Sequence, residues 1–153
     1  KYFVRDFVYQ NASNFQSFLP AIVFIIGCLL AFATGTSWGT FGMLIPIVQN
    51  VFPMDNPLAV VCISACMAGA VCGDHCSPIS DTTIMASAGA QCDHVNHVST
   101  QLPYAITVAA VSFVSYLIAG FVPKAYISLP IALVLMLLTI FVLHRTLKGK
   151  AAA

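Results

Sequence analysis

One short segment of the chain, residues 73–81 (GDHCSPISD), combines two carboxylates, an imidazole and two hydroxyls between long apolar stretches. An ionised Asp in the middle of a bilayer costs about 2.5–3.5 kcal/mol on insertion scales, so Asp74 and Asp81 require water, a bound cation or a shared proton. In an unbroken helix they would lie on one face about 10 Å apart. Pro78 breaks the helix and lets them converge, while freed carbonyls add oxygen ligands for a cation such as Na⁺.

The individual residues of this segment have more than one interpretation. Asp81 precedes Thr82 and would also serve as the N-cap of a helix that resumes there. Asp74 follows the expected end of a helix, where the macrodipole disfavours negative charge, which makes it the stronger functional candidate. His75 either titrates a proton or only pairs with Asp74, and the sequence leaves both open.

A second polar interruption, residues 34–40 (TGTSWGT), divides another apolar stretch. Its Ser and Thr side chains compete for backbone hydrogen bonds and so disfavour a continuous helix, although Gly and hydroxyl residues also occur in ordinary helix packing. Two interrupted segments in succession indicate the binding site of a transporter. The candidate ligands for Na⁺ or substrate are the oxygens of Thr34, Thr36, Ser37, Thr40, Ser77, Ser80, Thr82 and Thr83, with Asp74, Asp81 and Ser77 as the first choice for Na⁺.

Two clusters of Cys, His and Asp, at 72–76 and 92–97, raise the question of a metal centre. Neither has the C-x₂-C spacing of a zinc module, and His94 and His97 fall in an expected polar loop where a solvated His is ordinary. Most of the cysteines lie in apolar runs, where Cys packs as a small hydrophobic residue. The sequence therefore favours neither a zinc site nor structural disulfides, and we expect no cofactor beyond the transported ions.

The elements that must position these groups belong in a membrane. The 153 residues are 59% hydrophobic and 7% charged, contain no Glu, and have a mean hydropathy of +0.92. No charged residue occurs between Asp6 and Asp55 or between Asp93 and Lys124, and such stretches sit in lipid. The net charge of +1 without a basic cluster excludes an electrostatic nucleic-acid binder.

The chain divides into a connector or interfacial segment, a transmembrane domain and a tail, at residues 1–16, 17–144 and 145–153. Apolar segments 18–33 and 41–52 flank the first interruption, and each is somewhat short for a span of about 20 residues. They fit either a re-entrant hairpin with its tip at mid-membrane or a spanning helix that is unwound there.

The rest of the chain predicts one interrupted helix and two continuous spans. Segments 58–72 and about 82–90 flank the second interruption, and a polar loop follows at 91–99. Segments 102–122 and 129–143 are apolar without interruption. Basic residues follow the last span at once, which predicts a cytoplasmic C-terminus; they are Arg145, Lys148 and Lys150.

Three stretches of this chain together resemble a known family: residues 33–42 (ATGTSWGTFG), 73–83 (GDHCSPISDTT) and 92–104 (CDHVNHVSTQLPY). They look like the NhaC-type Na⁺/H⁺ antiporters, and the chain resembles the C-terminal half of a member. The resemblance implies an all-α polytopic protein of a bacterial inner membrane. It also implies two inverted repeats, each with a re-entrant hairpin and an interrupted helix, of which residues 18–52 and 58–90 would form one.

We therefore expect a sodium/proton antiporter, not an enzyme, in which Na⁺ and H⁺ share a carboxylate site and Asp74, Asp81 and His75 couple the ions. One alternative is a Na⁺- or H⁺-coupled exchanger of small organic acids, such as malate or lactate, or of amino acids. The other is a non-transporting membrane subunit or assembly module. Expected partners are the lipid bilayer, the other half of the transporter and further copies in a homo-oligomer, with a small organic anion under the first alternative.

Overall fold

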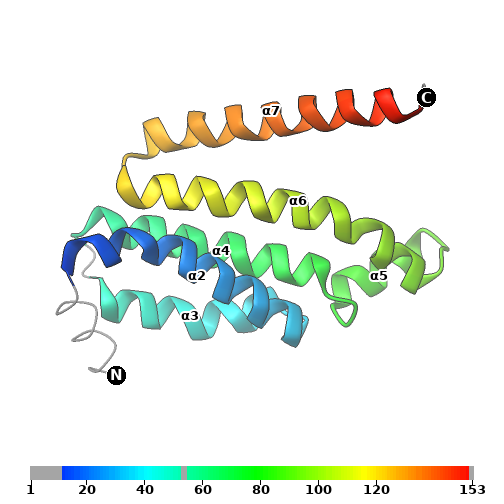
Figure 1. The fold of residues 1–153 in the computed structure, drawn as a ribbon. Coiled ribbons are helices and arrows are strands. Elements are labelled where there is room, and N and C mark those ends of the chain that lie inside the picture. Colours follow the sequence, from blue (N-terminus) through cyan, green and yellow to red (C-terminus); the bar gives the residue numbers. More distant parts are fainter. Residues whose placement is uncertain (1–11, 53–54, 152–153) are drawn as a thin grey trace.

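The computed structural model describes residues 12–52 and 55–151, and within these residues every regular element is a helix (Figure 1). The first eleven residues of the predicted connector lie outside the described part. Four of the helices, namely α2, α4, α6 and α7, are long and apolar enough to cross a membrane. The predicted all-α polytopic fold is confirmed at this level. The helices are α2 (Ala12–Thr34), α3 (Ser37–Val51), α4 (Pro57–Cys76), α5 (Asp81–Gly89), α6 (His94–Phe121) and α7 (Ala125–Ala151).

The first predicted interruption is present but shorter than expected. Helix α2 ends at Thr34, and Gly35 takes a left-handed conformation with φ of +66°, which glycine adopts without steric cost. Thr36 is the extended N-cap of α3, and its side-chain oxygen accepts a hydrogen bond from Gly39 N–H at 3.4 Å. Because this cap supplies an acceptor for the free N–H groups, Ser37 and the three residues after it are helical, and the prediction that they are unwound was wrong.

The second predicted interruption lies between α4 and α5. The sequence had suggested that Asp74 follows the end of the helix. Helix α4 instead continues to Cys76, so Asp74 lies in its last turn. Ser77 then leaves the helix with φ of −74° and ψ of 128°, the extended geometry that a following proline favours. Its N–H still donates to the Asp74 carbonyl at 3.1 Å.

Helix α5 begins after a serine cap. Ser80, and not Asp81, is the N-cap, with an extended backbone and a side-chain oxygen that accepts from Thr82 N–H at 3.3 Å. The sequence interpretation of Asp81 as the cap was therefore wrong. Because Ser80 is the cap, α5 begins one residue earlier than a cap at Asp81 would allow. Asp81 therefore lies in the first turn, where negative charge is favoured.

Helix α6 begins at His94, eight residues before the predicted start of its apolar span. The reason is the carboxylate of Asp93, which caps the helix by accepting from Asn96 N–H at 2.8 Å. The polar residues after it therefore form the first two turns of the helix and not a loop. At the other end of the chain, α7 continues as a helix through most of the residues expected to form a tail.

The closest packing is between α2 and α4, which run side by side in Figure 1. Gly69 and Gly73 of α4 face the backbone of α2, so that a methyl group on either would overlap the carbonyl of Phe24 or of Cys28. Gly120 of α6 meets the α2 backbone in the same way. Small residues that let helix backbones touch are typical of helix pairs in membranes.

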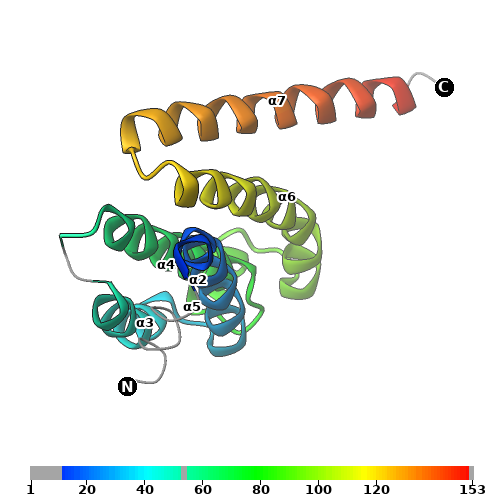
Figure 2. The same ribbon diagram turned by 60° about the vertical axis from the view of Figure 1, so that its left-hand side comes forward.

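The remaining helices pack less tightly. A buried apolar cluster joins α3 to the beginning of α4, and it consists of Val48, Val51, Phe52, Ala59 and Cys62. Helix α7 lies at the outer edge of the bundle in both Figure 1 and Figure 2, and among the described helices it contacts only α6. Many of its large apolar side chains are exposed, as lipid-facing or partner-facing surfaces are.

Candidate ion-binding site at two helix breaks

The two interruptions of the chain meet at one end of the bundle (Figure 1). Gly35, at the tip between α2 and α3, is buried against the turn that follows α4. A methyl group at Gly35 would lie 3.0 Å from the carbonyl carbon and oxygen of Ile79. The backbones of the two breaks are thus in direct contact.

A buried carboxylate lies next to this contact. Asp74 is only 5% exposed, and the Ser80 hydroxyl donates a hydrogen bond to its Oδ1 at 2.8 Å. Ser80 itself is completely buried. The bond joins the last turn of α4 to the cap of α5, so it closes the second break over the carboxylate.

A chain of hydroxyls extends from Asp74 to the surface. Because Ser80 donates its single hydroxyl hydrogen to Asp74, the hydroxyl of Thr82, 2.8 Å away, is the donor to Ser80 Oγ. Thr82 is exposed, whereas Ser77 is buried and its Oγ accepts from Ile79 N–H at 3.4 Å. Thr83 donates to a carbonyl of α4 at 3.5 Å, so the second break carries several hydroxyl oxygens, of which Ser80 Oγ bonds the carboxylate directly.

Two hydroxyls of the first break donate to carbonyls four residues earlier in the chain. Thr34 donates to the Leu30 carbonyl at 2.8 Å, and the buried Thr40 donates to the Thr36 carbonyl at 2.9 Å. Thr36 is exposed and caps α3, and Ser37 is half-buried. A hydroxyl that gives its hydrogen to a carbonyl keeps its oxygen lone pairs, so these oxygens can still accept hydrogen bonds or bind a cation.

The other predicted coupling groups, Asp81 and His75, bond locally and not to Asp74. Asp81 is exposed, and its Oδ1 accepts from Thr82 N–H at 2.9 Å. His75 is also exposed, and its Nδ1 lies 3.0 Å from the Val71 carbonyl. Of the two interpretations of His75 that the sequence left open, pairing with Asp74 does not occur in this structure.

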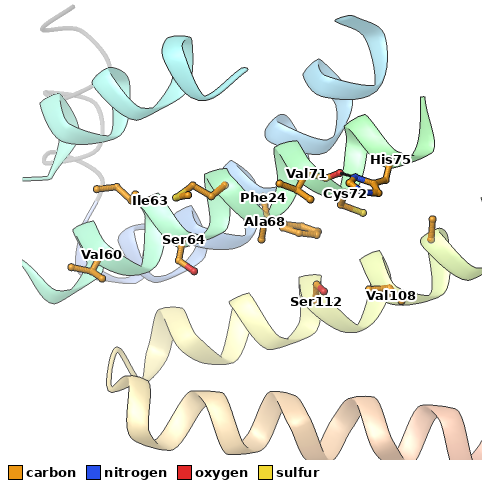
Figure 3. A pocket seen from close by; sticks show the side chains of 12 residues that line it. Phe24, Val60, Ile63, Ser64, Ala68, Val71, Cys72, His75, Val108 and Ser112 are labelled. Atoms are coloured by element: carbon orange, nitrogen blue, oxygen red, sulfur yellow. Dashed lines mark hydrogen bonds between the residues drawn. The ribbon is translucent and has the colours of Figure 1, made fainter. Parts of the chain in front are cut away.

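His75 instead lines a largely apolar groove of about 850 Å³ between α2, α4 and α6 (Figure 3). Cys72 lies beside it at one end of the groove, and Ser64 and Ser112 add hydroxyls farther along. Ser64 Oγ lies 3.0 Å from the Tyr116 hydroxyl of α6. The lining of this groove is therefore mainly apolar, whereas the second break, which contains Asp74, is rich in hydroxyl groups.

One residue at the break was missed by the sequence analysis. His94 had been interpreted as a solvated loop residue, but its Nε2 lies 2.7 Å from the Pro78 carbonyl and its Nδ1 lies 3.0 Å from Ser87 Oγ. Ser87, on α5, is 3% exposed. The available signal was Asp93, whose capping pattern places the next residue on the first turn of a helix.

The chemistry of this region rests on oxygen. Among the described residues no three of the Cys, His and Asp side chains come together as a metal site, and the six cysteines are free thiols. A carboxylate with hydroxyl and carbonyl oxygens is the ligand set that hard cations prefer, and a carboxylate also binds a proton. The arrangement around Asp74 is thus suited to exchange one for the other without a covalent step.

The four long apolar helices indicate a multi-pass membrane protein. The model of the Na⁺/H⁺ antiporter family matches residues 4–121, and the chain belongs to this family. The narrower NhaC-type assignment stays a prediction. Membership points to a transporter and not to an enzyme.

Comparison with curated proteins identifies several relatives. An uncharacterized protein of Haemophilus influenzae is 56% identical over 107 residues, which cover 69% of this chain and 21% of the relative. A malate-2H(+)/Na(+)-lactate antiporter of Bacillus subtilis is 35% identical over 63% of this chain and 21% of its own length. An arginine/ornithine antiporter of Halobacterium salinarum is 35% identical over 66% of this chain and 22% of its own. The matched region is thus about a fifth of these relatives. No solved structure matches the chain.

Proposed function

We propose that this chain carries the cation-binding site of a secondary antiporter that exchanges Na⁺ for H⁺ across a membrane. The observation that supports this most directly is the buried Asp74 carboxylate, bonded to Ser80 at 2.8 Å where two helix breaks meet. Membership of the Na⁺/H⁺ antiporter family supports the same function. A buried carboxylate is costly unless it pairs with a cation or binds a proton.

In the proposed mechanism Na⁺ and H⁺ compete for Asp74. Na⁺ binds the carboxylate together with the oxygens of Ser77 and Ser80, and the first break contributes Thr36 or Ser37. When Na⁺ binds, the Ser80 hydroxyl turns its hydrogen away from Asp74, so that both oxygens face the cation. When a proton binds instead, the carboxyl group loses its charge and Na⁺ leaves. Asp81 and His75, at the exposed edge, are the candidate groups that pass protons to the site.

The test is Na⁺-dependent proton movement in vesicles that contain the full-length parent protein. We expect Asp74→Asn to abolish exchange, because an amide has no negative charge to bind Na⁺ and cannot take up and release a proton. Asp81→Asn should slow exchange less, because its carboxylate is exposed and bonds only its own helix start. Asp55→Asn, an exposed carboxylate before α4, is the matched control and should leave exchange unchanged. Undiminished exchange in Asp74→Asn would reject the proposed site.

Competition at one carboxylate also predicts how Na⁺ affinity depends on pH. Each Na⁺ that binds displaces a proton, so the apparent KM for Na⁺ should rise as the pH falls, by up to about tenfold per pH unit. The maximal rate at saturating Na⁺ should change much less. Measuring the Na⁺ dependence at several pH values checks this, and an apparent KM that is the same at all of them would argue for separate Na⁺ and H⁺ sites.

A second candidate function is the exchange of a small organic acid or amino acid coupled to Na⁺ or H⁺. The relatives named as malate/lactate and arginine/ornithine antiporters favour it. In this chain the N-terminus of α5, with the hydroxyls of Thr82 and Thr83, would receive the carboxylate of such a substrate, since helix N-termini favour anions. Stimulation of the flux by malate, lactate, arginine or ornithine would distinguish this function from exchange of cations alone.

We further propose that the chain works together with other helices of a longer protein, in an inner membrane and as a homo-oligomer. The matched region is about a fifth of its relatives, and the apolar faces of α6 and α7 are largely exposed. The basic residues near the end of α7 support a cytoplasmic C-terminus. The test is a fusion, after residue 153, of a reporter that is active only in the periplasm. Activity of this reporter would contradict a cytoplasmic C-terminus.

A further inference from the structure

We propose that His94 is a positioning residue, which rests on the proposed function: through the Pro78 carbonyl it holds the turn that carries Ser80 against Asp74. The ring of His94 bridges two elements. Nε2 lies 2.7 Å from the carbonyl of Pro78 in the second break, and Nδ1 lies 3.0 Å from Ser87 Oγ on α5.

The hydrogen on Nε2 of the His94 ring follows from its partner. A carbonyl oxygen can only accept, so Nε2 carries a proton and donates to Pro78. Nδ1 lies 3.0 Å from Ser87 Oγ, which also donates to the Ile84 carbonyl at 2.9 Å, so the Ser87 side chain is itself held in place and fixes the ring in this orientation. The base of the ring is also fixed, because Asp93 caps α6 and makes His94 its first residue. His94 is therefore held at both ends of its side chain.

The turn itself has only weak internal hydrogen bonds. Between Ser77 and Ser80 the backbone bond is 3.4 Å long, and Ile79 N–H reaches Ser77 Oγ at the same distance of 3.4 Å. Both are longer than the usual 2.9–3.0 Å for such bonds. The 2.7 Å bond from His94 is the shortest that any residue makes to the backbone of this turn, among the described residues. The turn is therefore held from outside by α6.

The position of Ser80 follows from the position of this turn. Ser80 is the second residue after Pro78, and its hydroxyl is both the donor to Asp74 and the cap of α5. If the Pro78 carbonyl moves, Ser80 moves with it, and the bond of 2.8 Å to Asp74 lengthens. His94 touches neither Asp74 nor the proposed ion, so it would act on the site only through the turn.

The experiment compares two substitutions of His94 in the full-length parent protein. His94→Leu removes the donor, whereas His94→Gln keeps an N–H at a similar reach. We expect His94→Leu to raise the apparent KM for Na⁺ about three- to tenfold, the effect of losing one hydrogen bond, with the maximal rate within about twofold. His94→Gln should recover most of the affinity. His97→Leu, one turn along α6, is the matched control and should behave as the unmodified protein.

A second measurement does not depend on transport. Hydrogen–deuterium exchange of the amides of residues 77–82 should be faster in His94→Leu, and faster to a smaller extent in Ser87→Ala, and close to normal in His94→Gln. Unchanged protection of these amides in His94→Leu would overturn the proposal. So would an unchanged KM for Na⁺ in His94→Leu while Asp74→Asn abolishes exchange, and in that case the proposed function would stand. If the unmodified protein exchanges no Na⁺ for H⁺, the proposed function fails, and the amide protection alone decides the role of His94.

Discussion

Ser80 serves two structural purposes with one hydroxyl group. It donates to the buried Asp74 and accepts from Thr82 N–H in the first turn of α5, so the stability of the helix start and the orientation of the carboxylate depend on the same atom. A cap formed by Asp81 would have separated these two purposes. Placing serine at this position therefore makes the polar environment of Asp74 a direct consequence of how α5 begins.

We predict that Ser80→Ala lowers both stability and Na⁺ affinity. The loss of a cap and of a donor to a buried carboxylate should cost about 1–3 kcal/mol of the free energy of unfolding. The apparent KM for Na⁺ should rise about tenfold, because the same hydroxyl group is also lost from the proposed binding site. Thermal unfolding in detergent and Na⁺ titration of exchange measure the two effects. Ser128→Ala, which removes a half-buried hydroxyl bonded to the Lys124 carbonyl just before α7, should change neither.

At this scale the sequence predicted the types of group but not their partners. Asp74 was identified as the stronger candidate because a charge at the end of an apolar helix needs an explanation, and that reasoning depends only on composition and the macrodipole. The choice of Ser80 over Asp81 as the cap depends on how many residues the turn at Pro78 uses. The contact of His94 with Pro78 joins residues 16 apart in the chain, and no local pattern specifies it.

The packing of α2 on α4 is set by two glycines one helical turn apart. We predict that Gly73→Ala destabilises the protein by about 1–3 kcal/mol, the usual cost of inserting a methyl group where no space exists. The methyl group would overlap the backbone of Cys28 and Phe32, which cannot rotate away as a side chain can. Thermal unfolding of the purified parent in detergent measures the loss.

Gly89→Ala is the matched control for this substitution. A methyl group at Gly89 has no other atom within 4 Å, so the change should be neutral or should stabilise α5 by about 0.5–1 kcal/mol, the helix preference of Ala over Gly. Equal unfolding temperatures for Gly73→Ala and Gly89→Ala would mean that α2 and α4 do not touch in the way described.

The contact between the two breaks gives a second prediction for the elements. Gly35→Ala should cost about 1–2 kcal/mol for the left-handed backbone alone, and its methyl group would also push against the Ile79 backbone. We expect exchange to be reduced more than for Gly42→Ala, a glycine of α3 with no atom within 4 Å of the added methyl group. Exchange rates in vesicles at matched protein amounts check this. Equal rates for the two variants would show that transport does not require this contact.

The breaks themselves were predicted from the sequence, but their lengths were not. Clusters of Gly, Ser, Thr and Pro mark an interruption, whereas a cap such as Thr36 or Asp93 decides where the next helix begins. As a result the helices are longer than the apolar runs. Helix α4 has 20 residues and rises about 30 Å, the thickness of the hydrocarbon layer, so Asp74 lies near one end of a helix that can cross by itself. The mid-membrane depth of the breaks stays a prediction.

For the molecule as a whole, we predict that these 153 residues alone do not transport. Among the described residues there is one pair of breaks, and alternating access requires a second unit that moves against the first. In proteoliposomes that contain only this chain, the internal pH should stay constant after a Na⁺ pulse, whereas the full-length parent should respond. Saturable exchange by the 153 residues alone would show the prediction to be wrong.

The glycine contacts between α2 and α4 have a mechanical consequence. Side chains between two helices can change rotamer and so let the helices slide past each other. At Gly69 and Gly73, however, the backbone of α4 contacts the backbone of α2 with no side chain between them. We therefore expect α2 and α4 to move as one rigid unit. Each of the two breaks directly follows one of these helices. If the proposed ion binds there, its release requires either that this helix pair moves as a unit or that the surrounding protein moves around it.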